Sequence, residues 1–177
     1  MYTKEVITMG SGSSGLYSGT GGGSQPYAET YHVVKEELNK DKKDQDIYNK
    51  SDGYFKNPTA INLESAIDGN RLVFQGNSAE GAFTYVMDKK GNIIFGKRLN
   101  PNNPSKRAPH PTLIGGKDPQ VQAAGIITFR KGRILSIDDR SGHFRPNSLS
   151  LNKVDAALSK LYDRNPNIFD KYSKWRK

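Results

Sequence analysis

Six side chains in the segment 109–146 combine the groups that proton transfer and phosphate binding need: His110, Thr112, Arg140, Ser141, His143 and Arg145. Histidine titrates near neutrality and can take or give a proton. Arginine and hydroxyl groups stabilise phosphate charge. RNA cleavage through the substrate's own 2′-hydroxyl needs this set and no metal ion or cofactor. We therefore predict that His110 and His143 share the acid and base work, while the other four hold the phosphate.

Other uses of these residues fit the sequence less well. The histidines and nearby aspartates have none of the common metal-ligand spacings, such as HxxxH or HExxH, so we expect no metal site. Ser141 lacks the GxSxG context of a serine nucleophile. A purely structural alternative remains, in which His143 caps a turn and His110 is exposed.

The elements that would bring the two histidines together are a glycine turn and a hairpin. Residues 124–129 and 133–137 are short β-prone apolar runs, joined by the polar, glycine-containing link 130–132. The segment 138–142 ends the second strand, and His143 follows it. A loop at the end of a strand is a common position for functional side chains.

The rest of the chain predicts an α+β fold. A helix is expected at 27–46 and a short one at 60–67, followed by strands at 71–75, 82–88 and 92–97. With the central hairpin these give an antiparallel meander sheet of about five strands. An amphipathic helix at 151–162 follows, and the tail at 168–177 could form a last helix. Residues 99–109 read as a loop.

Composition favours one domain. The chain has 177 residues and no cysteine, which excludes disulfides and thiolate metal sites. No apolar run is long enough to cross a membrane. Residues 1–24 include the Gly/Ser-rich stretch 10–24 and are expected to be a flexible or fusion linker, leaving 25–177 as the single domain.

Positive charge is concentrated around the histidines. Residues 89–145 hold 12 Lys/Arg and 3 Asp/Glu, whereas residues 1–88 hold 8 and 12. A basic surface suits a polyanion such as RNA, because neutralising phosphates releases counterions. Seven basic residues are expected to contact the RNA backbone: Lys97, Arg98, Lys106, Arg107, Arg130, Lys131 and Arg133.

The pattern His-x-Thr-x-x-Gly-Gly, then Ala-Ala-Gly, a hairpin and Ser-Gly-His-aromatic-x-Pro resembles the C-terminal toxin domains of bacterial polymorphic toxins of the Rhs and contact-dependent inhibition type. The resemblance covers residues 110–146, about a fifth of the chain. It implies a domain delivered by a larger toxin into the cytoplasm of a competing cell and neutralised by a cognate immunity protein. Helices before an antiparallel sheet also resemble the fold of barnase, EndoU and colicin-type ribonucleases.

These lines together predict an antibacterial toxin that is a metal-independent ribonuclease acting on tRNA or another structured RNA. One rival is an NAD-dependent ADP-ribosyltransferase toxin, with His110 and Thr112 near the nicotinamide ribose. Its catalytic acid would have to be Glu80 or an aspartate, because no glutamate follows Glu80. A second rival is a non-catalytic RNA-binding module, which binds RNA in a salt-dependent way without turnover.

Overall fold

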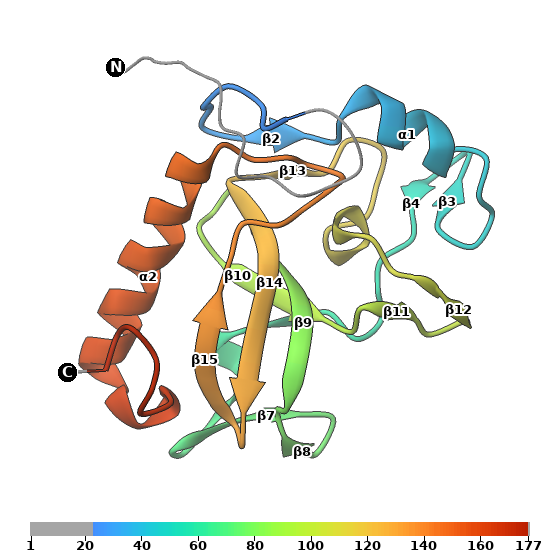
Figure 1. Ribbon diagram of the computed structural model, residues 1–177. Coiled ribbons are helices and arrows are strands. Elements are labelled where there is room, and N and C mark those ends of the chain that lie inside the picture. Colours follow the sequence, from blue (N-terminus) through green and yellow to red (C-terminus); the bar gives the residue numbers. More distant parts are fainter. Residues whose placement is uncertain (1–22, 177) are drawn as a thin grey trace.

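The computed structural model describes residues 23–176, so nearly all of the predicted linker at 1–24 lies outside the described residues. Two α-helices and several antiparallel sheets form an α+β fold, as predicted (Figure 1). The helices are α1 (Lys35–Asp41) and α2 (Leu151–Arg164). Four single 3-10 turns accompany them: η1 (Glu64–Ala66), η2 (His110–Leu113), η3 (Ser148–Ser150) and η4 (Pro166–Ile168).

The largest sheet has the order β15-β14-β9-β10-β5, with every neighbouring pair antiparallel. Its strands are β5 (Ile61–Asn62), β9 (Gly81–Met87), β10 (Ile93–Gly96), β14 (Ala123–Arg130) and β15 (Arg133–Ile137). The hairpins β9–β10 and β14–β15 confirm the strands predicted at 82–88, 92–97, 124–129 and 133–137. The alternation of apolar and polar residues in these strands is strong enough to predict them from the local sequence.

The remaining strands do not extend this sheet into a single meander. They pair separately as β2 (Tyr31–His32) with β13 (Gln120–Val121), β3 (Tyr48–Asn49) with β4 (Gly53–Tyr54), β11 (Leu99–Asn100) with β12 (Asn103–Arg107), and β6 (Ile67–Asp68) with β7 (Arg71–Phe74) and β8 (Asn77–Ser78). The strand predicted at 71–75 therefore exists but lies outside the main sheet. The loop predicted at 99–109 contains the β11–β12 hairpin.

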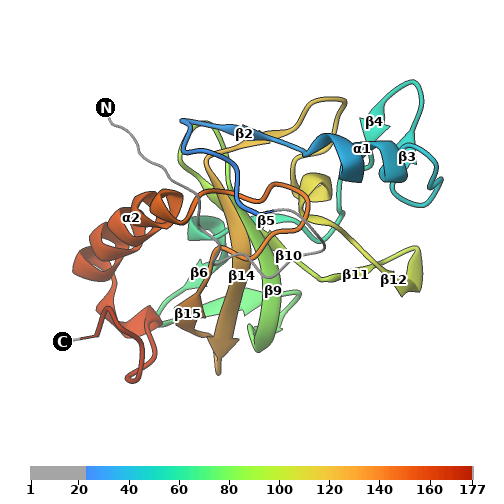
Figure 2. The same cartoon turned by 45° about the horizontal axis from the view of Figure 1, so that its top comes forward.

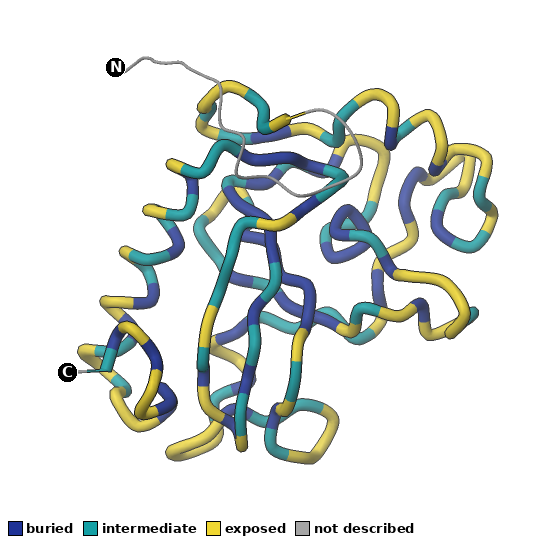
Figure 3. Tube along the Cα trace, viewed as in Figure 1, coloured by how far each residue is buried: buried dark blue, intermediate teal, exposed yellow. Residues whose placement is uncertain are grey.

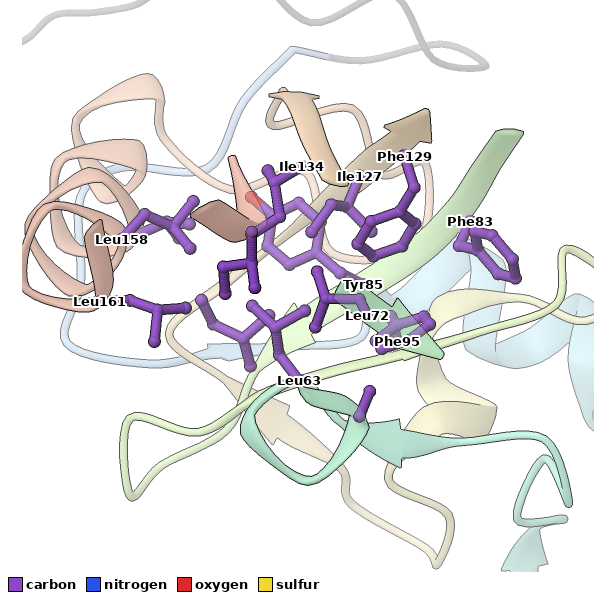
Figure 4. Packing of buried hydrophobic residues seen from close by; sticks show 14 of the residues in the cluster. Leu63, Leu72, Phe83, Tyr85, Phe95, Ile127, Phe129, Ile134, Leu158 and Leu161 are labelled. Carbon is purple, nitrogen blue, oxygen red and sulfur yellow. The ribbon is translucent and has the colours of Figure 1, made fainter. Parts of the chain in front are cut away.

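Two faces of the central strands carry two apolar clusters, because successive side chains in a strand point to opposite sides. Phe83, Tyr85 and Phe129 face the larger cluster, which α2 covers with Leu158 and Leu161 (Figure 4). The buried residues of α2 follow one side of the helix, and its other side is exposed (Figure 3). This confirms the amphipathic helix predicted at 151–162.

The smaller cluster holds the alternate residues of the same strands. Val86 and Ala124 pack there with Leu113 of η2 and Phe144 of the segment after β15. Both histidine-bearing segments are therefore anchored to the sheet by a buried neighbour. In Figure 2, α1 and η2 lie on one side of the sheet and α2 lies on the other.

Three predicted helices differ from the structure. The helix predicted at 27–46 is limited to α1, because Tyr31 is buried in the smaller cluster and β2 pairs with β13. The helix predicted at 60–67 is only η1, flanked by β5 and β6. The tail forms η4 and turns, since Phe169 bridges Ile134 of β15 instead of continuing a helix.

Candidate functional site

His143 lies in a tight turn that the segment Ser-Gly-His-Phe-Arg builds from its own groups. The Ser141 hydroxyl accepts a hydrogen bond from the Phe144 amide at 3.2 Å, and the Arg145 amide donates to the Ser141 carbonyl at 2.8 Å. Phe144 is fully buried, which fixes the turn on the sheet. The His143 carbonyl accepts the Val34 amide at 2.8 Å, just before α1. The turn is thus tied to both the sheet and the helix.

The side chain of His143 faces two carboxylates of α1. Its Nε2 lies 2.8 Å from Asp41 Oδ2 and 3.8 Å from Glu37 Oε1. The Nε2 is buried and has no partner in hydrogen-bond geometry within residues 23–176, so the contact becomes an ion pair when the ring is protonated. The Tyr54 hydroxyl donates to the same Asp41 Oδ2 at 2.6 Å. Burial is the main reason that the pKa of Tyr54 is raised, and the Asp41 carboxylate raises it further.

Arg145 is bound to the same helix. Its guanidinium forms ion pairs with Glu36 and, at 3.6 Å, with Glu37, and its Nε donates to the Gly142 carbonyl at 3.2 Å. Only 6% of the side chain is exposed. The sequence predicted a phosphate ligand at this position, but the structure uses the charge of Arg145 to hold the loop on α1.

These contacts explain why a short helix buries two acidic residues. Glu37 and Asp41 are one turn apart, so they lie on the same face of α1. Asp41 also ends the helix, where the helix dipole disfavours a negative charge. The nearby Arg145 guanidinium and the Tyr54 hydroxyl offset both costs. Sequence analysis missed Glu37, Asp41 and Tyr54, and the acidic pair spaced four residues apart was the only local signal.

His110 opens η2 and is held against β14. Its Nε2 donates to the Gly125 carbonyl at 2.7 Å, and the residue is only 7% exposed. Burial lowers the pKa of His110 to about 4, although the hydrogen bond to Gly125 opposes the shift. A carbonyl can only accept, so the proton of the neutral ring is on Nε2 and the lone pair is on Nδ1. The side chain is buried rather than exposed.

Gly125, the glycine of the Ala-Ala-Gly motif, permits a close crossing of two backbones. A Cβ at this position would lie 2.0 Å from the Asp138 carbonyl oxygen. That oxygen accepts a hydrogen bond from the Tyr85 hydroxyl at 2.7 Å, and the Asp138 carboxylate accepts from the Ile126 and Arg140 amides, both at 2.9 Å. The segment that leads from β15 to His143 therefore begins beside Gly125, whose carbonyl binds His110.

The segments that carry the two histidines pack together, because Leu113 of η2 and Phe144 lie in the same buried cluster. Burial is the main cause of the lowered pKa of His110, and the Arg98 guanidinium adds to it. Arg98 is partly exposed, its Nε is buried without a hydrogen-bond partner, and it forms no ion pair within the described residues. Arg98, twelve residues before His110 in the chain, therefore has a guanidinium without a carboxylate partner in the described part of the protein.

The other predicted phosphate ligands have internal partners or lie at the surface. The Thr112 hydroxyl donates to the Pro109 carbonyl at 2.7 Å, and Ser141 is 1% exposed. The Arg140 side chain is 68% exposed and lies 4.0 Å from Asp138. Thr112 and Ser141 thus stabilise η2 and the His143 turn, whereas Arg140 remains available to a ligand.

The seven predicted RNA contacts fall into two groups. Lys97, Arg98, Lys106 and Arg107 lie on or beside β11 and β12, the hairpin that leads to His110. Arg130, Lys131 and Arg133 lie at the β14–β15 turn, at the far end of these strands from Gly125 (Figure 1). Lys106 pairs with Asp44 and Asp46, and Arg130 pairs with Asp170.

No metal-binding group of three or more His, Asp or Glu side chains occurs within residues 23–176. An open hollow of about 510 Å³ lies beside the end of α1 and contains neither histidine. It is lined by Lys40, Lys43, Asp44, Gln45, Asp46 and Lys106. No helix in the described part of the chain is long and apolar enough to cross a membrane.

Comparisons with known proteins find no matching family model, no similar curated protein and no similar solved structure.

Proposed function

We propose that this protein is a metal-independent ribonuclease whose site is formed by His110, His143 and Arg98. The observation that supports this most is that the two histidine segments are anchored in one buried cluster through Leu113 and Phe144, while the guanidinium of the partly exposed Arg98 has no carboxylate partner in the described residues. A guanidinium without a carboxylate partner suits a phosphate group, which it can bind through charge-assisted hydrogen bonds. Two histidines beside a bound phosphate supply both proton transfers that RNA cleavage requires.

His110 is the general base in this proposal. Because its pKa is about 4, its ring is unprotonated at physiological pH, so its lone pair is available. Its Nε2–H is engaged by the Gly125 carbonyl, which leaves Nδ1 to take the proton of the 2′-hydroxyl. The 2′-oxygen then attacks the phosphorus and forms the 2′,3′-cyclic phosphate.

His143 is the general acid. Because Nε2 faces the carboxylates of α1, Nδ1 gives the proton to the 5′-oxygen as the bond from that oxygen to phosphorus breaks, and the proton gained by His110 balances the one that His143 loses. Asp41 and Glu37 lie beside its Nε2 and orient the ring. Arg98 holds the non-bridging oxygens, and Arg140 lies on the same loop as His143 and can add a second cation. Arg145 acts as a positioning residue.

The toxin context extends this proposal. The Ser-Gly-His-Phe-Arg-Pro motif, on which the resemblance to polymorphic toxin domains depends, is the turn that carries His143. We therefore propose that the domain is delivered into the cytoplasm of a competing cell, attacks tRNA or another structured RNA, and is neutralised by an immunity protein. The rival ADP-ribosyltransferase lacks comparable support, because Glu80 accepts the Lys131 amide at 2.8 Å at the opposite end of the sheet.

Product chemistry tests the proposal. A short RNA strand is incubated with the protein in EDTA, beside the same strand with deoxyribose at the cleaved nucleotide. The mechanism predicts a 2′,3′-cyclic phosphate end from the RNA and no cleavage of the deoxy-substituted strand. Cleavage of the deoxy strand, or transfer of label from NAD to a cell component, would contradict it.

A further inference from the structure

The far end of the β14–β15 hairpin carries a second basic surface, which includes an exposed aromatic ring. We define the far-end surface as Arg71, Arg130, Lys131, Arg133, Lys171 and Tyr172. Gly132 brings Arg71 to this turn, since the Leu72 amide donates to the Gly132 carbonyl at 2.7 Å. The Asp170 amide donates to the Ile134 carbonyl at 2.9 Å, which brings the tail residues beside β15.

Tyr172 is the most exposed large apolar or aromatic side chain in the described part of the chain, at 70%. Its ring is nevertheless held in place. The Arg130 guanidinium lies 5.2 Å from the ring centroid, and the Lys171 ammonium lies 5.0 Å from it. The Tyr172 amide donates to Asp170 Oδ2 at 2.8 Å. Two cations therefore flank an exposed aromatic ring.

The charge of the far-end surface remains positive after its internal pairs are counted. Asp170 binds Arg130 through two hydrogen bonds of 3.0 and 2.7 Å, and Glu80 accepts the Lys131 amide. Arg71 donates to the Ser78 hydroxyl, and neither it nor Lys131, Arg133 or Lys171 forms an ion pair within residues 23–176. Asp68 lies opposite Arg71 in the β6–β7 pair, so five cations face three carboxylates.

We propose that the far-end surface is a second RNA subsite, in which Tyr172 stacks on an unpaired base and the surrounding cations contact phosphates. An aromatic ring flanked by cations is the arrangement that binds single-stranded nucleic acid without reading its sequence. This inference rests on the proposed ribonuclease function and narrows its substrate. The RNA must have unpaired nucleotides that reach from the cleaved bond to the far end of the hairpin.

The length of β14 sets this requirement. Gly125, which binds His110, and Arg130 are five residues apart on the strand, or about 17 Å at the usual rise of a β-strand. A dinucleotide at the histidines cannot also contact Tyr172. A single strand of about 12 nucleotides, within the range of single-strand binding sites, can contact both.

Binding of RNA that cannot be cleaved tests the subsite separately from catalysis. The probes are fluorescent 2′-O-methyl strands of 3 and 12 nucleotides, whose blocked 2′-oxygen cannot attack, and affinity is measured by anisotropy. Tyr172→Ala should weaken binding of the 12-nucleotide strand about tenfold and leave the 3-nucleotide strand unaffected. Tyr172→Phe keeps the ring and should bind as the wild type does. Tyr27→Ala is the matched control, because Tyr27 is also exposed and has Lys153 5.4 Å from its ring centroid.

The salt dependence of RNA binding by charge variants is a second test of the subsite. Lys131→Gln with Arg133→Gln should make the salt dependence of 12-nucleotide binding shallower by about 1.4, the value for two lost phosphate contacts on a single strand. Lys89→Gln with Lys90→Gln removes two exposed cations from the β9–β10 turn and should leave that slope unchanged.

The outcomes distinguish the subsite from the proposed function. Equal weakening by Tyr172→Ala and Tyr27→Ala, or no weakening by either, would overturn the subsite even if the protein cleaves RNA. Absence of 12-nucleotide binding at low salt would also overturn it, and would leave the far-end surface to a protein partner. Tyr172-dependent binding by a wild-type protein that cleaves no RNA would support the subsite and reject the proposed catalysis.

Discussion

Arg145 separates two accounts of the loop that carries His143. In one, suggested by the sequence, its guanidinium holds the phosphate. In the other, based on the structure, it pairs with Glu36 and Glu37 and fixes the loop on α1. Arg145→Ala distinguishes them, because the first account predicts a loss of RNA affinity in a stable protein and the second predicts a loss of stability.

The size of that loss follows from burial. The side chains of Arg145 and Glu37 are 6% and 8% exposed, so removing the cation leaves a carboxylate buried. Breaking such a pair usually costs about 3–5 kcal/mol. We expect the lower end, about 3 kcal/mol, because Lys40 remains 3.2 Å from Glu37. This is a large share of a typical folding stability of about 5–15 kcal/mol.

Urea unfolding measures this loss. With a denaturant slope of about 2 kcal/mol/M, the midpoint of Arg145→Ala should fall by about 1.5 M. Arg140→Ala is the control, because its side chain is 68% exposed and should change stability by no more than about 0.5 kcal/mol. An unchanged midpoint for Arg145→Ala, combined with weaker RNA binding, would refute the structural role and restore Arg145 as a phosphate ligand.

Three further predictions concern the supports of the site. Gly125→Ala should destabilise the protein by about 3 kcal/mol or more in urea unfolding, because its methyl group would lie 2.0 Å from the Asp138 carbonyl oxygen, and a stable variant would contradict the crossing. The unfolded chain takes up a proton on His110 near pH 6.5, whereas the folded chain does so only near pH 4. The free energy of unfolding should therefore fall by about 3 kcal/mol as the pH is lowered from 6.5 to 4. His110→Gln should remove that part of the pH dependence of the urea midpoint, and an unchanged profile would refute the burial of a neutral ring. Tyr54→Phe removes the hydrogen bond to the buried Asp41 carboxylate and should cost about 1.5–3 kcal/mol, and an unchanged unfolding midpoint would show that this bond is dispensable.

The hairpins were predictable from the sequence because their information is local. Alternating apolar residues and a short polar turn specify β9–β10 and β14–β15 without knowledge of the rest of the chain. The helix α2 was predictable for the same reason, since Val154, Leu158 and Leu161 recur along one side. These elements form the scaffold on which the candidate site is built.

The site itself depends on contacts between distant parts of the chain. Asp41 is buried because His143, about 100 residues later, lies beside it, and no local pattern shows that a helix will bury an acidic face. The role of Gly125 likewise appears only when Asp138 crosses it. The same reasoning applies to Arg145. An arginine in this segment suggested phosphate binding, and only the fold shows that its guanidinium pairs with Glu36 and Glu37.

The most direct test of the central claim is cleavage of bacterial RNA in EDTA by the wild type and by His110→Ala, His143→Ala and Arg98→Gln. We predict discrete cleavage by the wild type, losses of at least about a hundredfold for either histidine variant, and a weaker but measurable activity for Arg98→Gln. Each variant should retain the circular dichroism spectrum of the wild type. Full activity of a folded His143→Ala protein, or intact RNA after incubation with the wild type, would contradict the proposed site.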